Sequence, residues 1–193
     1  LTQLTMRTFH TGGAGTSAVT GAVDRLKDLL FVPKKIANSA ILAKKAGTIS
    51  EVKKRPTGGW DVLIDKERHF IPAERSLLPT TTVGATVRAG DELSDGLLNP
   101  QELLQYSGNM SRVRNHLTET VHRTYTDNKI PVKRRNVETM VKAMTNIAFI
   151  EDAGSHPTLL RGQTAPLAEV EAFNRTARAQ GKEPVQFKAE LKP

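Results

Sequence analysis

The chain has 193 residues, a formal net charge of +8 at pH 7 and a pI near 9.9, so it can bury one core or two small ones and attracts polyanions such as DNA or RNA. It contains no cysteine, which excludes a disulfide framework and thiolate metal sites. No apolar run approaches the about twenty residues of a membrane span, and no signal peptide is visible, so we expect no membrane partner.

The first thirteen residues read LTQLTMRTFHTGG and predict a short helix that ends at the glycine pair. Met6 and His10 are four apart and Arg7 and His10 three apart, so the three side chains share one side of this helix. Taken singly, a helical methionine is more often a core residue, and a lone histidine is more often at the surface. Together they favour a nucleoside triphosphate site: methionine for the base, arginine for phosphate oxygens and histidine as a proton donor.

Two elements follow before the middle of the chain. Apolar residues at helical spacing predict a helix over 22–31, stopped by Pro33. From Ile36 to Val87 the sequence changes to short apolar runs separated by turn residues at 57–59 and 65–66. These runs predict the strands of a small antiparallel sheet, at residues 41–43, 48–52, 60–64 and 69–71.

Helices are predicted in the second half. Asn99 is a typical cap, followed by Pro100 and by Glu102 in the first turn. Apolar residues recur every four positions from Val113 to Tyr125 and again from Val137 to Met144, and the short link at 127–131 predicts an antiparallel helix pair. A last helix is predicted from about Pro166 to Gln180, with four side chains facing inward: Leu167, Val170, Phe173 and Ala177.

Other chemical groups favour ordinary structural roles. The remaining histidines lack ligand spacing, so we predict surface or hydrogen-bonded rings and no zinc site, at His69, His116, His122 and His156. Asp91 and Asp95 with Gly96 favour a turn over a calcium loop. The basic runs are typical of solvated faces and assign no nucleic-acid-binding residue: 34–35, 44–45, 53–55 and 133–135.

The run Thr2–His10, followed by Gly12-Gly13, resembles the trigger loop of the largest catalytic subunit, beta-prime, of bacterial-type multisubunit RNA polymerases. Residues 89–104 resemble the jaw region of that subunit, as does the segment 117–144. The family carries a glycine and a proline ahead of the matched threonine, where this chain has only Leu1. We therefore expect a fragment of a larger polypeptide or one piece of a split subunit.

The resemblance implies roles for individual residues. Gln3, Met6, Arg7 and His10 would bind the incoming nucleoside triphosphate, and Arg7 and His10 would be catalytic, with His10 either a general acid or a positional charge. Some basic residues could line a path for downstream DNA. The Asp-x-Asp-x-Asp metal motif of the family is absent, so we expect this segment to bind no cofactor and magnesium to be held elsewhere in the assembly.

The implied enzyme is a DNA-directed RNA polymerase, a nucleotidyltransferase that is inactive as this isolated chain. Its implied partners are the beta and alpha subunits, the remainder of beta-prime, the DNA template, the RNA transcript and the nucleoside triphosphate, in the cytoplasm at the nucleoid. The alternative function is a non-catalytic, basic module that binds nucleic acid or assists assembly in a transcription complex.

We predict an α+β fold with five parts. They are a trigger-loop arm at 1–16, an exit helix and connector at 17–35, a small β-rich jaw-like domain at 36–98, a helical segment at 99–146, and a C-terminal loop and helix at 147–193 that lead to the rest of the subunit.

Overall fold

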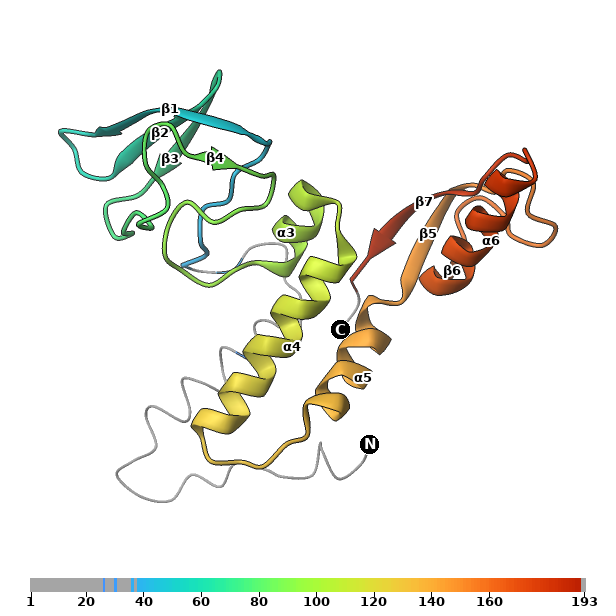
Figure 1. Ribbon diagram of the computed structural model, residues 1–193. Coiled ribbons are helices and arrows are strands. Elements are labelled where there is room, and N and C mark those ends of the chain that lie inside the picture. Colours follow the sequence, from blue (N-terminus) through green and yellow to red (C-terminus); the bar gives the residue numbers. More distant parts are fainter. Residues whose placement is uncertain (1–25, 27–29, 31–35, 37, 192–193) are drawn as a thin grey trace.

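The computed structural model describes residues 26, 30, 36 and 38–191 of the chain. Three parts follow one another in Figure 1: a β-rich part, a helical hairpin, and a small sheet that carries one helix. The two sheets and the helices between them confirm the predicted α+β class. None of the helices within these residues is long and apolar enough to cross a membrane.

The β-rich part is a four-stranded antiparallel sheet in the order β3-β2-β1-β4. Three of the four predicted strands are confirmed within it. The fourth prediction, 41–43, is wrong: Leu42 makes one isolated bridge to Glu92, and the amide of Ile41 donates to the Ser94 hydroxyl instead of to a neighbouring strand. The strands are β1 (Gly47–Lys54), β2 (Trp60–Ile64), β3 (Glu67–Ile71) and β4 (Thr86–Val87).

Turn chemistry and alternation explain this sheet. Gly59 has a φ of 83° in the β1–β2 turn, a conformation that glycine adopts without strain. Asp65, in the β2–β3 turn, has a φ of 51° and accepts a hydrogen bond from the amide of Thr48. Along β2, Val62 and Ile64 are buried and the other three residues are partly exposed, so one face of the sheet packs on a core and the other faces solvent.

Helix α3 (Pro100–Ser107) begins as its sequence predicts. The Asn99 side chain accepts a hydrogen bond of 2.9 Å from the amide of Gln101, and Pro100 occupies the first turn. Gly108 ends the helix in the left-handed conformation, with a φ of 60°.

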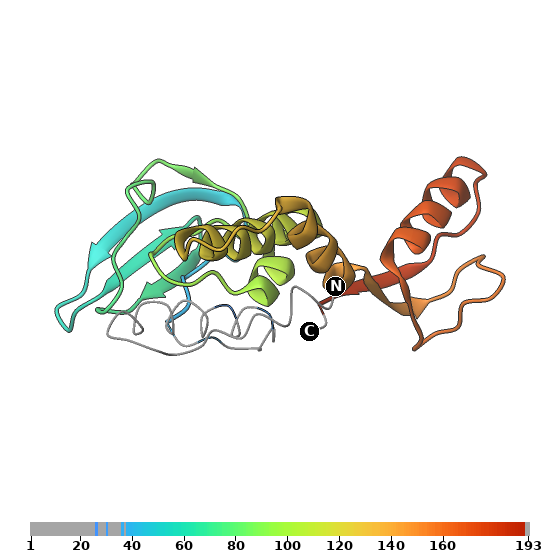
Figure 2. The same cartoon turned by 90° about the horizontal axis from the view of Figure 1, so that it is seen from below.

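The two long helices α4 (Met110–Asp127) and α5 (Arg134–Thr145) form the predicted antiparallel hairpin (Figures 1 and 2). Their facing side chains are almost completely buried: Val113, Leu117, Val121, Val137 and Val141. This seam is part of a core that continues into the C-terminal sheet and also includes Leu26.

The C-terminal part contains three strands that the sequence did not predict. They are β5 (Ile147–Asp152), β6 (Thr164–Pro166) and β7 (Gln186–Glu190), in the antiparallel order β6-β5-β7. Between β6 and β7 lies the predicted last helix, α6 (Leu167–Ala179). Three of its four predicted inward residues are buried and Phe173 is partly buried, so this prediction is confirmed.

Two arginines of α4 make hydrogen bonds outside their own helix. The Arg112 guanidinium donates to the carbonyl of Ala89 at 3.1 Å and to the Asp91 carboxylate at 2.8 Å, which ties the helix to the β-rich part. Arg114 donates to the hydroxyl of Thr145 at 2.8 Å and to its carbonyl at 3.1 Å, at the carboxyl end of α5.

Candidate functional site

The residues predicted to bind the nucleotide, Gln3, Met6, Arg7 and His10, lie outside the described residues. Their roles therefore stay predictions. The described part of the chain offers three other surfaces with functional chemistry: a pocket along α4, the turn between α4 and α5, and the outer face of the β-rich sheet.

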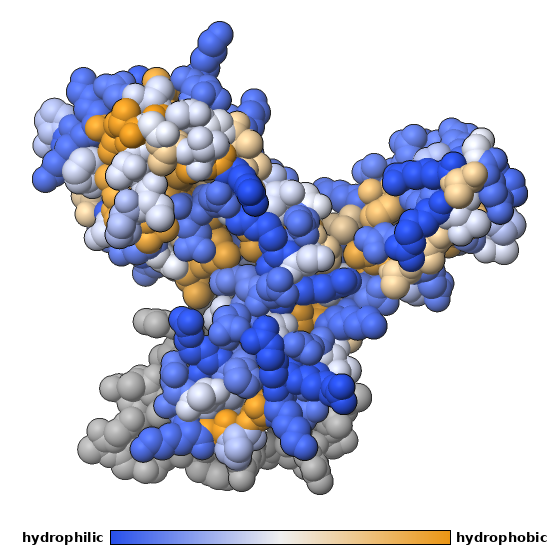
Figure 3. Space-filling model, in the orientation of Figure 1, coloured by the Kyte–Doolittle hydropathy of each residue, from blue (hydrophilic) through white to orange (hydrophobic). Residues whose placement is uncertain are grey.

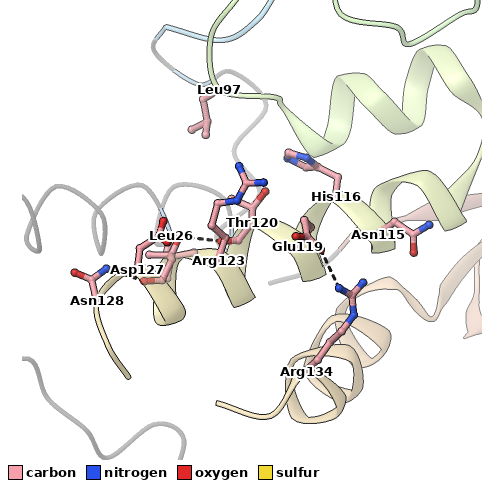
Figure 4. Close-up of a pocket in the computed structure, with 11 residues that line it drawn as sticks. Leu26, Leu97, Asn115, His116, Glu119, Thr120, Arg123, Asp127, Asn128 and Arg134 are labelled. Carbon is pink, nitrogen blue, oxygen red and sulfur yellow. Dashed lines mark hydrogen bonds and ion pairs between the residues drawn. The ribbon is translucent and has the colours of Figure 1, made fainter. Parts of the chain in front are cut away.

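A pocket of about 810 Å³ runs along one side of α4 (Figure 4). Its lining is mostly polar and comes mainly from successive turns of that helix: Asn115, His116, Glu119, Thr120, Arg123, Thr124, Asp127 and Asn128, with Arg134 from α5 and two leucines, Leu26 and Leu97. Both signs of charge line the same space, so the pocket is not a simple anion or cation site.

An ion-pair network links the two helices beside this pocket. Arg134 contacts Glu138 at 3.0 Å on its own helix and Glu119 of α4 at 2.9 Å, the pair drawn with a dashed line in Figure 4. Hydrogen bonds to Glu138 and Glu119 raise the pKa of Arg134. Since all three side chains are about half exposed, the network adds little to the stability of the hairpin.

His116 is the least satisfied polar group of the pocket. Burial lowers the pKa of its ring, although a hydrogen bond with the backbone of Leu98 acts in the opposite direction. Its Nε2 atom is buried without a hydrogen-bond partner. The expectation of a surface or hydrogen-bonded ring therefore holds for only one of its two nitrogens.

The turn between the two helices carries a cluster of exposed positive charge. Four of its cations have no ion-pair partner among the described residues, and we call them the hairpin patch: Arg123, Lys129, Lys133 and Arg135. In the space-filling view, hydrophilic residues surround this turn and a small hydrophobic spot lies among them (Figure 3).

Helix α4 ends at this patch in a Schellman motif. The amide of Ile130 donates to the carbonyl of Tyr125, and the amide of Lys129 donates to the carbonyl of Thr126, both at 2.9 Å. Lys129 occupies the left-handed position of the motif with a φ of 56°, where glycine is the usual residue. A side chain there is strained by about 1 kcal/mol.

The outer face of the β-rich sheet joins cations with an exposed aromatic ring. Cross-strand pairing puts Lys53 opposite Asp61 and Asp61 opposite Phe70. The Arg55 guanidinium lies 4.8 Å from the centre of the Phe70 ring and 3.4 Å from the Asp61 carboxylate. Phe70 is 47% exposed, a combination that suits bases or phosphates.

The aspartates of the β-rich part bear on the question of a metal site. Within the part of the chain that the structure describes, no group of three or more histidine or carboxylate side chains is placed to hold a metal ion. Asp91 accepts hydrogen bonds from Arg112 and from the amide of Arg88, and Asp95 accepts one from the amide of Ser76. Both carboxylates thus stabilise turns, as predicted.

Comparison with known families decides where the chain belongs. The family model described as RNA polymerase Rpb1, domain 5, matches residues 1–177. The chain belongs to this family. The match begins at residue 1, so it includes the segment in which the nucleotide-binding residues were predicted.

Similar proteins of this family are named DNA-directed RNA polymerase subunit beta'. Identity is 34% for the protein of Desulforamulus reducens, 32% for that of Acetivibrio thermocellus and 31% for that of Clostridium acetobutylicum, each over 98% of this chain. The chain spans about 16% of the length of each. It therefore corresponds to one segment of a beta' subunit.

Within this Rpb1 domain 5 segment, the hairpin patch is the charged surface that sequence reasoning missed. The run 133–135 was visible, but Arg123 and Lys129 join it only once α4 and α5 fold back on each other. The sequence did contain a signal for this patch: between residues 122 and 135 there are five lysines and arginines and one carboxylate, Asp127.

Proposed function

We propose that this chain is part of the catalytic subunit of a DNA-directed RNA polymerase. The observation that carries the proposal is the family match over residues 1–177, together with relatives named beta' subunit that cover 98% of the chain. The proposal includes the other polymerase subunits, the DNA template and the RNA transcript as partners.

In this proposal the N-terminal segment closes on the incoming nucleoside triphosphate in each addition cycle. Met6 contacts the base, Gln3 helps to bind the substrate, and Arg7 and His10 lie near the phosphates. Positive charge there stabilises the negative charge that develops in the transition state and on the leaving pyrophosphate, and His10 can also donate a proton. Closure excludes water and completes the site only around a matched substrate.

Magnesium belongs to other parts of the enzyme in this proposal. The chain has no Asp-x-Asp-x-Asp motif, so the remainder of the subunit provides the metal ligands of nucleotidyl transfer. The β-rich part and the helical hairpin act as a jaw that holds downstream DNA. The net charge of +8 and the exposed Arg55–Phe70 surface support this role.

The test is nucleotide addition by the complete polymerase that carries this segment. We expect Arg7→Ala and His10→Ala each to slow single-nucleotide addition by roughly a hundredfold, because each removes a charge or a proton from the transition state. Arg7→Lys is the matched control that keeps the charge and should lose less. Unchanged elongation with an altered lifetime of the DNA complex would contradict the catalytic role and favour a non-catalytic nucleic-acid-binding module.

A further inference from the structure

Leu26 is fixed against the helical hairpin. It is helical and 5% exposed, and it is the described residue that lies nearest to His10 along the chain. It belongs to the same core cluster as Val113, Leu117 and Val121, the buried side chains of α4. The hydrophobic effect therefore holds this point of the chain on the hairpin.

The surroundings of Leu26 place it beside the middle of α4. It lines the same pocket as Thr120 and Thr124 of that helix, and Figure 4 draws it next to these turns. Leu97, which lies shortly before α3, lines the pocket as well. Leu26 is thus in a position to sense both the hairpin and the segment that leads into it.

Two further apolar residues repeat this contact. Leu30 is helical and lies four residues after Leu26, so the two side chains share one side of a helix. Leu30 is partly buried against the same cluster, and Ile36 is a buried member of it. The contact of Leu26 is therefore one of a series and not an isolated one.

The chain is fixed a second time directly after this series. Ser39 forms a parallel bridge with Leu97, in which the amide of Ala40 donates to the Leu97 carbonyl at 3.0 Å. The amide of Leu97 donates in turn to the carbonyl of Asn38 at 3.1 Å. A side chain at Gly96 would come within 2.6 Å of the Ala40 amide nitrogen, so the two segments are in direct contact.

We propose that Leu26 is a positioning residue for nucleotide addition. This inference rests on the proposed function, in which Arg7 and His10 act on the phosphates; they precede Leu26 by nineteen and sixteen residues. The place where a chain is fixed limits where its catalytic side chains can lie, and a shift of about 1 Å can cost a large factor in rate. Leu26 touches no substrate in this proposal and acts through Arg7 and His10.

The test is a double-mutant cycle in the complete polymerase, read out as the rate of single-nucleotide addition at saturating nucleoside triphosphate. We expect Leu26→Ala to slow addition by about tenfold when Arg7 and His10 are present. In a background that carries Arg7→Ala and His10→Ala, the same substitution should cost less than about twofold, because the groups that it positions are missing. Leu26→Met keeps most of the side-chain volume and should restore most of the rate.

The matched control is Leu167→Ala. Leu167 is 1% exposed and belongs to the same core cluster, but it lies at the start of α6. Its truncation removes the same atoms from the same core, so any loss of rate should be the same factor in both backgrounds. If Leu26→Ala prevents assembly of the polymerase, Leu30→Ala carries the same test from a partly buried position on the same side of the helix.

The outcomes separate this inference from the proposed function. A wild-type rate in the Leu26 and Leu30 variants would overturn the positioning role, as would an equal loss in the two backgrounds, which is what a leucine that only fills the core would cause. In either case the proposed function stands if Arg7→Ala with His10→Ala slows addition. If that pair of substitutions leaves addition unchanged, both proposals fall.

Discussion

At the residue scale, His69 is the side chain whose burial has the clearest consequence. It is 3% exposed, and its Nε2 accepts a hydrogen bond of 3.1 Å from the amide of Lys44. Burial lowers the pKa of the ring, outweighing the opposite influence of Glu67. The folded chain therefore holds a neutral imidazole, because a proton on Nε2 would break the bond to Lys44.

This burial makes stability depend on pH. The pKa of His69 is lowered from 6.5 in the folded chain, so the unfolded chain binds the proton more readily than the folded chain does. The free energy of unfolding is therefore fully retained above about pH 6.5 and falls as the pH drops below that value. Urea unfolding at pH 7.5 and 5.5 should show lower stability at pH 5.5. His69→Gln keeps an acceptor for Lys44 but cannot titrate, and it should reduce this difference. A variant with the full wild-type difference would contradict this account.

At the scale of elements, the end of α4 shows a compromise between helix termination and charge. Lys129→Gly should raise the free energy of unfolding by up to about 0.6 kcal/mol, which is the relief of left-handed strain less the entropy that glycine adds to the unfolded chain. The control is Lys129→Ala. It removes the same charge but keeps a side chain in the left-handed conformation, so it should not stabilise. Chemical denaturation of the three proteins measures the difference, and equal effects of the two substitutions would argue against strain.

The elements also show what a sequence can predict. Periodicity and caps located α3, α4, α5 and α6 because each helix shows its apolar stripe and its terminators locally. Strands β6 and β7 gave no such signal: β6 is three residues long and includes Pro166, and β7 reads Gln-Phe-Lys-Ala-Glu, without a β-branched residue. They are strands because β5 pairs with both of them, which is a tertiary cause.

At the scale of the whole molecule, Arg112 joins parts that have separate cores. Its guanidinium bonds to two carbonyls and one carboxylate of the turn 89–91. We expect Arg112→Gln to destabilise the chain by about 1 kcal/mol after allowing for solvent screening, because two part-buried carbonyls lose their donor. Urea unfolding measures the change.

Arg134→Gln is the matched control, since it also removes a hydrogen-bonded arginine, here one with two carboxylate partners in a surface network. Its loss should be clearly smaller than that of Arg112→Gln. Equal losses would contradict the view that Arg112 fastens the β-rich part to α4. Hydrogen exchange adds a second measurement: faster exchange in Arg112→Gln should be confined to the β-rich part and to the first turn of α4.

The same scale separates what was predictable in the candidate site from what was not. The basic run at 133–135 and the histidines can be located in the sequence, but the sequence does not show which lysines and arginines form ion pairs with carboxylates. Arg134 pairs with Glu119 across fifteen positions, whereas Arg123 remains unpaired among the described residues. Only the antiparallel hairpin distinguishes these two arginines.

The order of the C-terminal sheet has a consequence for biosynthesis. Strand β5 is central and pairs with β7, although residues 153–185 separate them. The α4–α5 hairpin closes through nearby residues and can form while the ribosome is still translating, whereas β5 keeps one open edge until β7 has emerged. During that interval the open edge can pair with a strand of another nascent chain. A pause in translation before residue 186 should therefore promote aggregation, and a chaperone is most useful to this chain at that moment.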